Sequence, residues 1–404
     1  MTLDAGDGQN GGELRNRIVA EIDRNGPIPF SRYMEICLYE PEMGYYSRPR
    51  ERFGKAGDFY TSSDVHAVFG RLLARQFAEM WHALDSPERM ELIELGPGRG
   101  LFARDVLDWS AKQFPEFFHA LHYSLVEQSE HLRAKLAERL KEHAEAGKVS
   151  AVATLEDLAS HPFADERRKN GASGKDPRWG EDVIILANEF FDALPVEVID
   201  HRGAVRVGVA NGKFVESFAP PPAAENEFLD RYSVHPQQDE RVEVCLEALG
   251  WMERIASFLR ERRGFVLLID YGYTREQQLA GRHRDTLMTY RQHRAGASPY
   301  QAPGEQDITA HVNFTALRAR GAELGLEDVA LLTQSQFLIG IGEETQFADA
   351  FQDCALPQER AKVALQLRHL IAPEGMGETF QVLLMSRGVK KERAAQLSGL
   401  RLAR

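Results

Sequence analysis

A glycine-rich segment stands where a ligand could be bound, between an apolar run of strand length and a helical pattern. Its glycines are Gly96, Gly98 and Gly100. Glycines at such a junction let a ligand approach the backbone and leave the first N–H groups of the helix free to bind it. The spacing is GxGxG, and Leu101 interrupts the GxGxxG fingerprint of NAD-binding proteins. The loop therefore disfavours an NAD-dependent dehydrogenase and favours another nucleotide-type ligand.

Two acidic residues accompany this loop. Glu94 lies two positions before Gly96, as in enzymes that bind S-adenosylmethionine, and we expect it near the charged end of that ligand. Glu127 ends the next expected strand, 122–127, where a carboxylate can accept hydrogen bonds from both ribose hydroxyls. Loop and carboxylate together predict an S-adenosylmethionine site. The alternative is a plain strand-to-helix turn beside a surface glutamate.

A third group of polar residues follows the apolar strand expected at 182–188. Asn188 could orient the acceptor or the amino group of the donor, and Glu189 and Asp192 are three residues apart, so one helical turn would place both on one face. If the methyl acceptor is cationic, carboxylates can pair with it, offset its repulsion from a sulfonium and take its proton. We therefore expect Glu189 and Asp192 to hold the substrate. The alternative is that Asp192 caps a turn and Glu189 bonds to backbone.

Four further residues are weaker candidates. His311 is a second candidate for a catalytic role, although a lone histidine is more often structural. Asp270 and Tyr271 end the strand expected at 264–270 and are expected to line the acceptor pocket. Thr61 is expected to close over the cofactor, with a role as a helix cap as the equal alternative.

The elements that must position these residues alternate between strand and helix from residue 90 onward. Strands are expected at 90–95, 122–127, 148–153, 182–188, 264–270, 327–333 and 378–386. Such alternation predicts an α/β fold with a seven-stranded, doubly wound, Rossmann-like sheet. In such sheets the ligand lies beyond the carboxyl ends of the strands, where the strand order reverses. Four of these ends carry the motifs above, which predicts one shared site.

The remaining segments complete the expected domain organisation. We expect a flexible tail at 1–12, an N-terminal helical cap at 13–88 and a core at 89–274 that contains a β-hairpin excursion at 195–218. An insertion with helices and the sixth strand is expected at 275–375, the last core strand at 376–388 and a basic tail at 389–404. A single helix is expected at 239–262, and the apolar helix at 65–84 could serve as core or as the interface of a homodimer.

Composition limits the class of protein. The 404 residues carry a net charge of −12, which disfavours nucleic acid as the main partner. The three cysteines are far apart, so neither a disulfide framework nor a metal site is expected. The longest aliphatic runs have strand length, far short of the ~20 residues that span a bilayer, so no membrane insertion is expected. The absence of an apolar leader or an arginine-rich transit peptide favours a cytoplasmic, bacterial protein.

Several segments together resemble the MidA-like family, which includes the mitochondrial arginine methyltransferase that acts in complex I assembly. They are PFSRYM at 29–34, MGYY at 43–46, GDFYT at 57–61, ELGPGRG at 94–100, NEFFDALP at 188–195, IDYG at 269–272 and DITAHVNF at 307–314. The glycine loop is shared with many methyltransferases, whereas NEFFDALP and DITAHVNF are specific to the family.

The resemblance implies a class I methyltransferase with a helical N-terminal cap and S-adenosyl-L-methionine as cofactor. It implies a protein substrate, an arginine in a quinone-module subunit of complex I. The alternatives are a methyltransferase for a small molecule or another protein side chain, and an assembly factor that binds S-adenosylmethionine without turnover. The segment at 61–64, TSSD, departs from the usual family pattern.

Overall fold

The computed structural model describes residues 7–47, 67–160, 181–291, 294–295 and 298–403. The chain forms two compact units, each assembled from separate segments. Met1–Tyr60, Phe191–Trp251 and Gly272–Leu317 form what we call the N-terminal unit; Thr61–Phe190, Met252–Tyr271 and Arg318–Arg404 form the sheet unit. The units therefore interleave along the sequence, whereas the predicted segments were contiguous, because the chain leaves the sheet unit after residues 190 and 271 and returns to it later.

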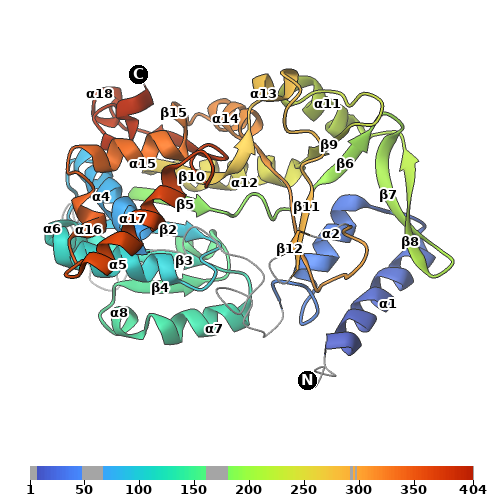
Figure 1. Ribbon diagram of the computed structural model, residues 1–404, viewed down its shortest axis with the longest axis horizontal. Helices are drawn as coiled ribbons and strands as arrows, with labels where there is room; N and C mark the ends of the chain where they lie inside the picture. Colours follow the sequence, from blue (N-terminus) through green and yellow to red (C-terminus); the bar gives the residue numbers. More distant parts are fainter. Residues whose placement is uncertain (1–6, 48–66, 161–180, 292–293, 296–297, 404) are drawn as a thin grey trace. The chain divides into compact units, whose positions relative to one another are not determined.

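The sheet unit is built on the Rossmann-like sheet that the alternation of strands and helices predicts (Figure 1). Its strand order is β15-β16-β10-β5-β2-β3-β4, and β14 pairs with the end of β10. Strands β4, β3, β2, β5 and β10 are parallel, while β16 runs antiparallel to both of its neighbours. The bounds are β2 Met90–Leu95, β3 Leu121–Val126, β4 Val149–Val152, β5 Asp182–Asn188, β10 Arg263–Tyr273, β14 Val312–Asn313, β15 Glu327–Thr333 and β16 Phe380–Arg387.

The strand order reverses between β2 and β5, since β3 and β4 follow on one side of β2 and β5 and β10 on the other. The loop after β2 and the tip of β5 therefore lie at the switch point, where open α/β sheets bind ligands. The central strand β5 is a continuous apolar run because both of its faces are covered.

One face of this sheet packs against a helical layer. Leu92, Leu125 and Leu186 belong to the same apolar cluster as residues of α4, α5 and α15. The bounds of the helices near this layer are α4 Ala67–Ala83, α5 Leu101–Gln113, α6 Pro115–Ala120, α7 Glu130–Arg139, α8 Lys141–Glu145, α9 Asp157–Ser160, α15 Gln334–Glu343, α16 Ala348–Phe351 and α17 Pro357–Ile371. On the other face, Gly321 of α14 (Phe314–Glu323) leaves room for Met385 and for Met252 of α12 (Leu246–Phe258).

The N-terminal unit contains a second, antiparallel sheet in which β7 pairs with β1, β6 and β8, and β6 with β9. The predicted hairpin is confirmed: β7 and β8 meet at Asn211 and Gly212, whose φ angles of 49° and 70° are those of a tight hairpin turn. The bounds are α1 Asp7–Asn25, β1 Ile28–Pro29, α2 Phe30–Tyr39, β6 Glu197–Asp200, β7 Gly203–Ala210, β8 Lys213–Ala219, α11 Ala223–Tyr232, β9 Arg241–Val244, α13 Arg275–Leu279, β11 Met288–Arg291, β12 Arg294–Ala295 and β13 Asp307–Thr309.

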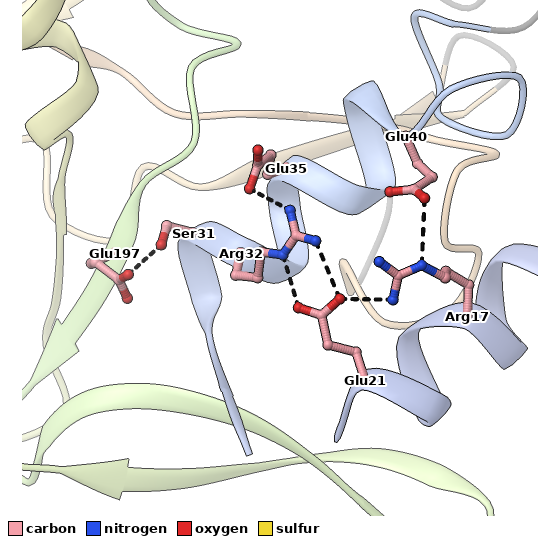
Figure 2. A network of polar contacts seen from close by, with 7 residues as sticks. All are labelled: Arg17, Glu21, Ser31, Arg32, Glu35, Glu40 and Glu197. Carbon is pink, nitrogen blue, oxygen red and sulfur yellow. Dashed lines mark hydrogen bonds and ion pairs between the residues drawn. The ribbon is translucent and has the colours of Figure 1, made fainter. Parts of the chain in front are cut away.

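A network of ion pairs joins α1 to α2 in this unit (Figure 2). The Glu21 carboxylate accepts hydrogen bonds of 2.8 Å from Arg17 and from Arg32 Nε. Arg32 also donates to Glu35 at 2.8 Å, and Arg17 lies 3.5 Å from Glu40. Glu21 is buried between the two guanidinium groups, so this network adds ion pairs to the apolar contact between the two helices.

Several sequence-based expectations about elements are wrong. Residues 239–262 are not one helix, because the strand β9 and the helix α12 replace it, and α11 was not expected. Residues 7–12, expected in the flexible tail, belong to α1. The expected basic tail contains α18 (Lys391–Ala394) and a 3-10 helix (Ser398–Ala403), and it buries Leu397 and Leu400. None of the described helices is long and apolar enough to cross a membrane.

Candidate active site

The glycine loop after β2 needs glycine for its backbone conformation at all three positions and for close packing at two of them. All three have positive φ, 64° at Gly96, 50° at Gly98 and 70° at Gly100. A Cβ atom at Gly96 would lie 2.7 Å from Phe190, and one at Gly100 would lie 2.6 Å from Leu136. A Cβ at Gly98 would meet no described atom within 4 Å. The side of the loop that is open for a ligand is therefore at Gly98, while Gly96 and Gly100 pack against the protein.

The backbone donors for a ligand come mainly from the start of the helix that follows the loop. The N–H groups of Gly96 and Gly100 are used within the protein, by Val126 O at 3.0 Å and Pro97 O at 2.8 Å. Helix α5 then begins at Leu101 with Gly100 as its N-cap and no side-chain cap. The first N–H groups of a helix have no intrahelical partner and carry the positive end of its dipole. Loop and helix therefore fit a ligand with a carboxylate or hydroxyl groups, as S-adenosylmethionine has.

Glu127 follows β3 at the same edge of the sheet. Its Oε1 accepts a hydrogen bond of 2.8 Å from Ser129 N–H, and its own N–H donates to Val152 O at 3.0 Å. Burial raises the pKa of Glu127, and the Ser129 N–H and the charge of Arg133 partly oppose that shift. The carboxylate is thus held in place through one oxygen, and Oε2 is the atom that would accept from a ribose.

Glu94 is a buried residue of β2, just before the glycine loop. It is 5% exposed, and Tyr123 donates a hydrogen bond of 2.9 Å to Glu94 Oε2. Burial raises its pKa to about 7, although the Tyr123 hydroxyl opposes the shift. Because side chains alternate along a strand, Glu94 shares its face of β2 with the core residue Leu92.

The tip of β5 carries Asn188 and Glu189. Glu189 has a φ of 50°, a left-handed conformation that costs a residue with a side chain about 1–2 kcal/mol. Its N–H donates to Ile269 O at 2.9 Å, and Asn188 Nδ2 lies 3.5 Å from Glu189 Oε1. The expected helical turn from Glu189 to Asp192 is wrong, since this segment forms bends and a turn. Glu189 and Asp192 therefore do not share one face of a helical turn.

Asp192 lies in the N-terminal unit among tyrosines and a second aspartate. It is 4% exposed, and its carbonyl accepts from Ala310 N–H at 3.0 Å. The Tyr46 hydroxyl donates to both carboxylate oxygens of Asp307, at 2.9 and 3.1 Å. Burial raises the pKa of Tyr46 and of Tyr290, and the charges of Asp307 and Asp192 add to both shifts. Asp192 and Asp307 therefore belong to one buried acidic and aromatic cluster.

His311 lies in the same unit and faces a second histidine. Its Nδ1 is 3.2 Å from His283 Nδ1, so one ring donates a proton and the other accepts it. Burial lowers the pKa of His311 to about 4, and His283 adds to the shift. The His283 ring stacks on Tyr273 at 5.4 Å. His311 is consequently neutral near pH 7 and part of a packed polar group.

Asp270 and Tyr271 are both buried near the end of β10. Asp270 is 1% exposed, and its carboxylate accepts from Tyr271 N–H at 2.9 Å and from Phe190 N–H at 3.2 Å. Tyr271 belongs to the apolar core and packs edge-on against Phe380. Thr61, the remaining predicted site residue, lies outside the described residues.

Three further residues near these sites were not among the predicted site residues, although Tyr46 was expected in the core of the cap. Phe190 lies against Gly96, and Tyr46 and Asp307 accompany Asp192. All three lie inside the segments NEFFDALP, MGYY and DITAHVNF. The contacts that these residues make depend on the tertiary structure. The sequence feature that indicates such residues is the presence of aromatic and acidic side chains beside the candidate carboxylates.

The strand order, the antiparallel β16 and the glycine loop at the switch point define a class I methyltransferase. Residues 72–330 match the family described as putative S-adenosyl-L-methionine-dependent methyltransferases, and the chain belongs to this family. The enzyme thus uses S-adenosyl-L-methionine, and the arrangement of Gly98, Glu127 and the start of α5 fits that cofactor.

Relatives and solved structures agree with this assignment. The chain is 30% identical to "Protein arginine methyltransferase NDUFAF7 homolog, mitochondrial" of Drosophila melanogaster, over 94% of this chain and 86% of the relative. It is 28% identical to the Homo sapiens protein arginine methyltransferase NDUFAF7, over 91% and 82%. A Burkholderia thailandensis likely methyl transferase, solved with S-adenosyl-homocysteine bound, has a TM-score of 0.79 and 27% identity over 99% of this chain and 97% of that one.

Proposed function

We propose that this methyltransferase modifies an arginine side chain of a protein, a subunit of the quinone module of respiratory complex I. The observation that carries the proposal is that the Drosophila and human relatives, which align with over nine-tenths of this chain, are named protein arginine methyltransferases. The buried acidic cluster of Asp192 and Asp307 supports a cationic acceptor, because carboxylates form charge-assisted hydrogen bonds with a guanidinium.

Methyl transfer to a guanidinium requires a bound methyl donor and a group that takes a proton from the acceptor. S-adenosylmethionine, when bound, supplies an electrophilic methyl group. A guanidinium is protonated at neutral pH and is a poor nucleophile, so the acceptor nitrogen must lose one proton as its electron pair forms the new N–C bond. The sulfur keeps the electrons of the broken S–C bond. We propose that Asp192 pairs with the guanidinium and that its carboxylate takes the proton.

A labelling experiment tests this proposal. Purified enzyme and tritiated S-adenosylmethionine are added to a lysate from cells that lack the endogenous enzyme, and labelled bands are hydrolysed to amino acids. Methylarginine in one protein band, absent with a Gly98→Val variant, is the expected result. Label confined to small molecules, or to another amino acid, would contradict the arginine assignment. Cofactor binding without any label would indicate an assembly factor.

The identity of the labelled band tests the second part. Mass spectrometry of that band should find the modified arginine in a subunit of the quinone module. A modified arginine in a protein unrelated to complex I would keep the activity and overturn the proposed substrate.

A further inference from the structure

The tips of β5 and β10 are tied together by one buried carboxylate. Asp270 is 1% exposed and accepts hydrogen bonds from two backbone N–H groups, Tyr271 on its own strand at 2.9 Å and Phe190 beyond β5 at 3.2 Å. A third bond, from Glu189 N–H to Ile269 O at 2.9 Å, continues the pairing of the strands. The position of the Phe190 backbone is therefore fixed from β10.

This fixation holds a strained turn. Glu189 is in the left-handed region with a φ of 50°, which disfavours any residue with a side chain. Such a conformation persists only where its surroundings over-determine it, and strained residues of this kind cluster at functional sites. The bonds on either side of the Glu189–Phe190 peptide, to Ile269 and Asp270, provide that determination.

The Phe190 ring, which follows this turn, packs against the glycine loop. The space where Gly96 would carry a Cβ is taken by Phe190, with Cδ2 at 2.7 Å and Cε2 at 3.5 Å from the Cβ position. A loop with three glycines at positive φ has large conformational freedom when nothing packs against it. The ring limits this freedom on the protein side, while Gly98 remains open on the other.

We propose that Asp270 and Phe190 act together as positioning residues for the cofactor: Asp270 holds Phe190, and the Phe190 ring holds the glycine loop in the conformation that binds S-adenosylmethionine. Asp270 thus acts through Phe190 on the loop rather than on the methyl acceptor. A preorganised loop loses less conformational entropy when the cofactor binds. Removing the contacts from Asp270 to Phe190 and from Phe190 to the loop therefore weakens binding.

A double-mutant cycle on cofactor binding tests this inference. Calorimetry with S-adenosyl-homocysteine is carried out on the full-length wild type, on Asp270→Asn, on Phe190→Ala and on the double variant. Asparagine retains one oxygen for Tyr271 but turns an N–H group toward Phe190 or loses that contact. We expect each single variant to raise Kd about tenfold. The double variant should be no weaker than the weaker single variant, because both changes break one chain of contacts.

Glu91→Gln is the matched control. Glu91 is a partly buried carboxylate of the same sheet that accepts from Ser124 at 2.6 Å. It lies at the opposite end of β2 from the loop, and its variant should keep Kd within twofold. Hydrogen exchange of the amides of residues 96–100 in the ligand-free protein gives a second readout, which should accelerate in Asp270→Asn and Phe190→Ala but not in the control.

Either of two results would overturn the proposal that Asp270 and Phe190 position the glycine loop. One is an unchanged Kd in Phe190→Ala, together with unchanged amide exchange. The other is a double variant whose loss of affinity equals the product of the two single losses, which would show independent effects. If Asp270→Asn fails to fold, Phe190→Ala alone decides the role of the ring, and Asp270→Ser repeats the cycle with a shorter acceptor.

Discussion

The Tyr123 hydroxyl donates a hydrogen bond of 2.9 Å to the Glu94 carboxylate in the interior of the sheet unit. This bond stabilises the ionised form, yet burial outweighs it, and the pKa of Glu94 rises from 4.5 to about 7. The acidic residue that precedes the glycine loop is thus half protonated near neutral pH in the ligand-free protein.

Replacing Glu94 with Gln should change how stability depends on pH. A carboxyl group with a raised folded-state pKa stabilises the fold below its unfolded value of 4.5, and that contribution disappears as pH rises through about 7. At about 1.4 kcal/mol per pH unit, the loss is at most about 3 kcal/mol. Urea unfolding of ligand-free wild type should therefore show decreasing stability between pH 5 and 8. Glu94→Gln should flatten this slope, and an equally steep slope would contradict the pKa shift.

Gly96→Ala and Gly98→Ala should separate folding from binding. At Gly96 the new methyl group overlaps Phe190 and the left-handed φ adds strain, so we expect a loss of stability of about 2–4 kcal/mol. At Gly98 only the strain remains, about 1–2 kcal/mol, but the methyl group occupies the open side of the loop.

Unfolding and calorimetry distinguish the two variants. Gly98→Ala should lose at least tenfold in affinity for S-adenosyl-homocysteine while it remains the more stable variant. Equal stability losses in both variants would refute the different roles assigned to Gly96 and Gly98.

Glu21→Gln should destabilise the N-terminal unit. Glu21 is largely buried and bonds to Arg17 and Arg32, whereas Glu35 is a half-exposed partner of Arg32. We expect a loss of about 1–2 kcal/mol for Glu21→Gln and less than about 0.5 kcal/mol for Glu35→Gln at pH 7. The two arginines lower the pKa of Glu21, so its contribution is present above pH 4.5 and is lost as pH falls further. A Glu21→Gln effect that grows on acidification would be inconsistent with this network.

Asp192→Asn should impair turnover without impairing cofactor binding. If Asp192 holds the guanidinium, kcat/KM for the methylated protein should fall about 10- to 100-fold, while Kd for S-adenosyl-homocysteine stays within twofold. Asp230→Asn is the control, since Asp230 is an exposed aspartate of the same unit. Near-normal turnover in Asp192→Asn would end the proposal that this carboxylate holds the substrate.

Most of the fold could be predicted because its signals are local. Strands such as β5 are apolar runs between polar ends, and the glycine loop and the Asn211-Gly212 turn have their own chemistry. The helix predicted over 239–262 failed because Arg241–Val244 is a strand only through its pairing with β6, which no local pattern shows. Likewise, the expected tail is ordered because Ser398 and Gly399 bond to Glu79 and Gln76 of α4.

The site was predictable to a lesser extent. Residue types identified Gly98 and Glu127 correctly as neighbours at one sheet edge, because strand ends of a parallel sheet meet there. They could not show that Asp270 bonds to the Phe190 backbone, or that Asp307 accompanies Asp192, since these contacts join segments about 80 to 115 residues apart. The burial of Glu94 and its hydrogen bond with Tyr123 also depend on packing that only the tertiary structure defines.

Titration calorimetry with S-adenosyl-homocysteine tests the cofactor site most directly. The wild type should bind the compound in a saturable 1:1 reaction, and Gly98→Val and Glu127→Ala should each weaken binding at least tenfold. Glu130→Ala, at an exposed neighbouring position at the start of α7, should bind like the wild type. Heat of binding that is unchanged in both Gly98→Val and Glu127→Ala would contradict the placement of the methyl donor at this edge of the sheet.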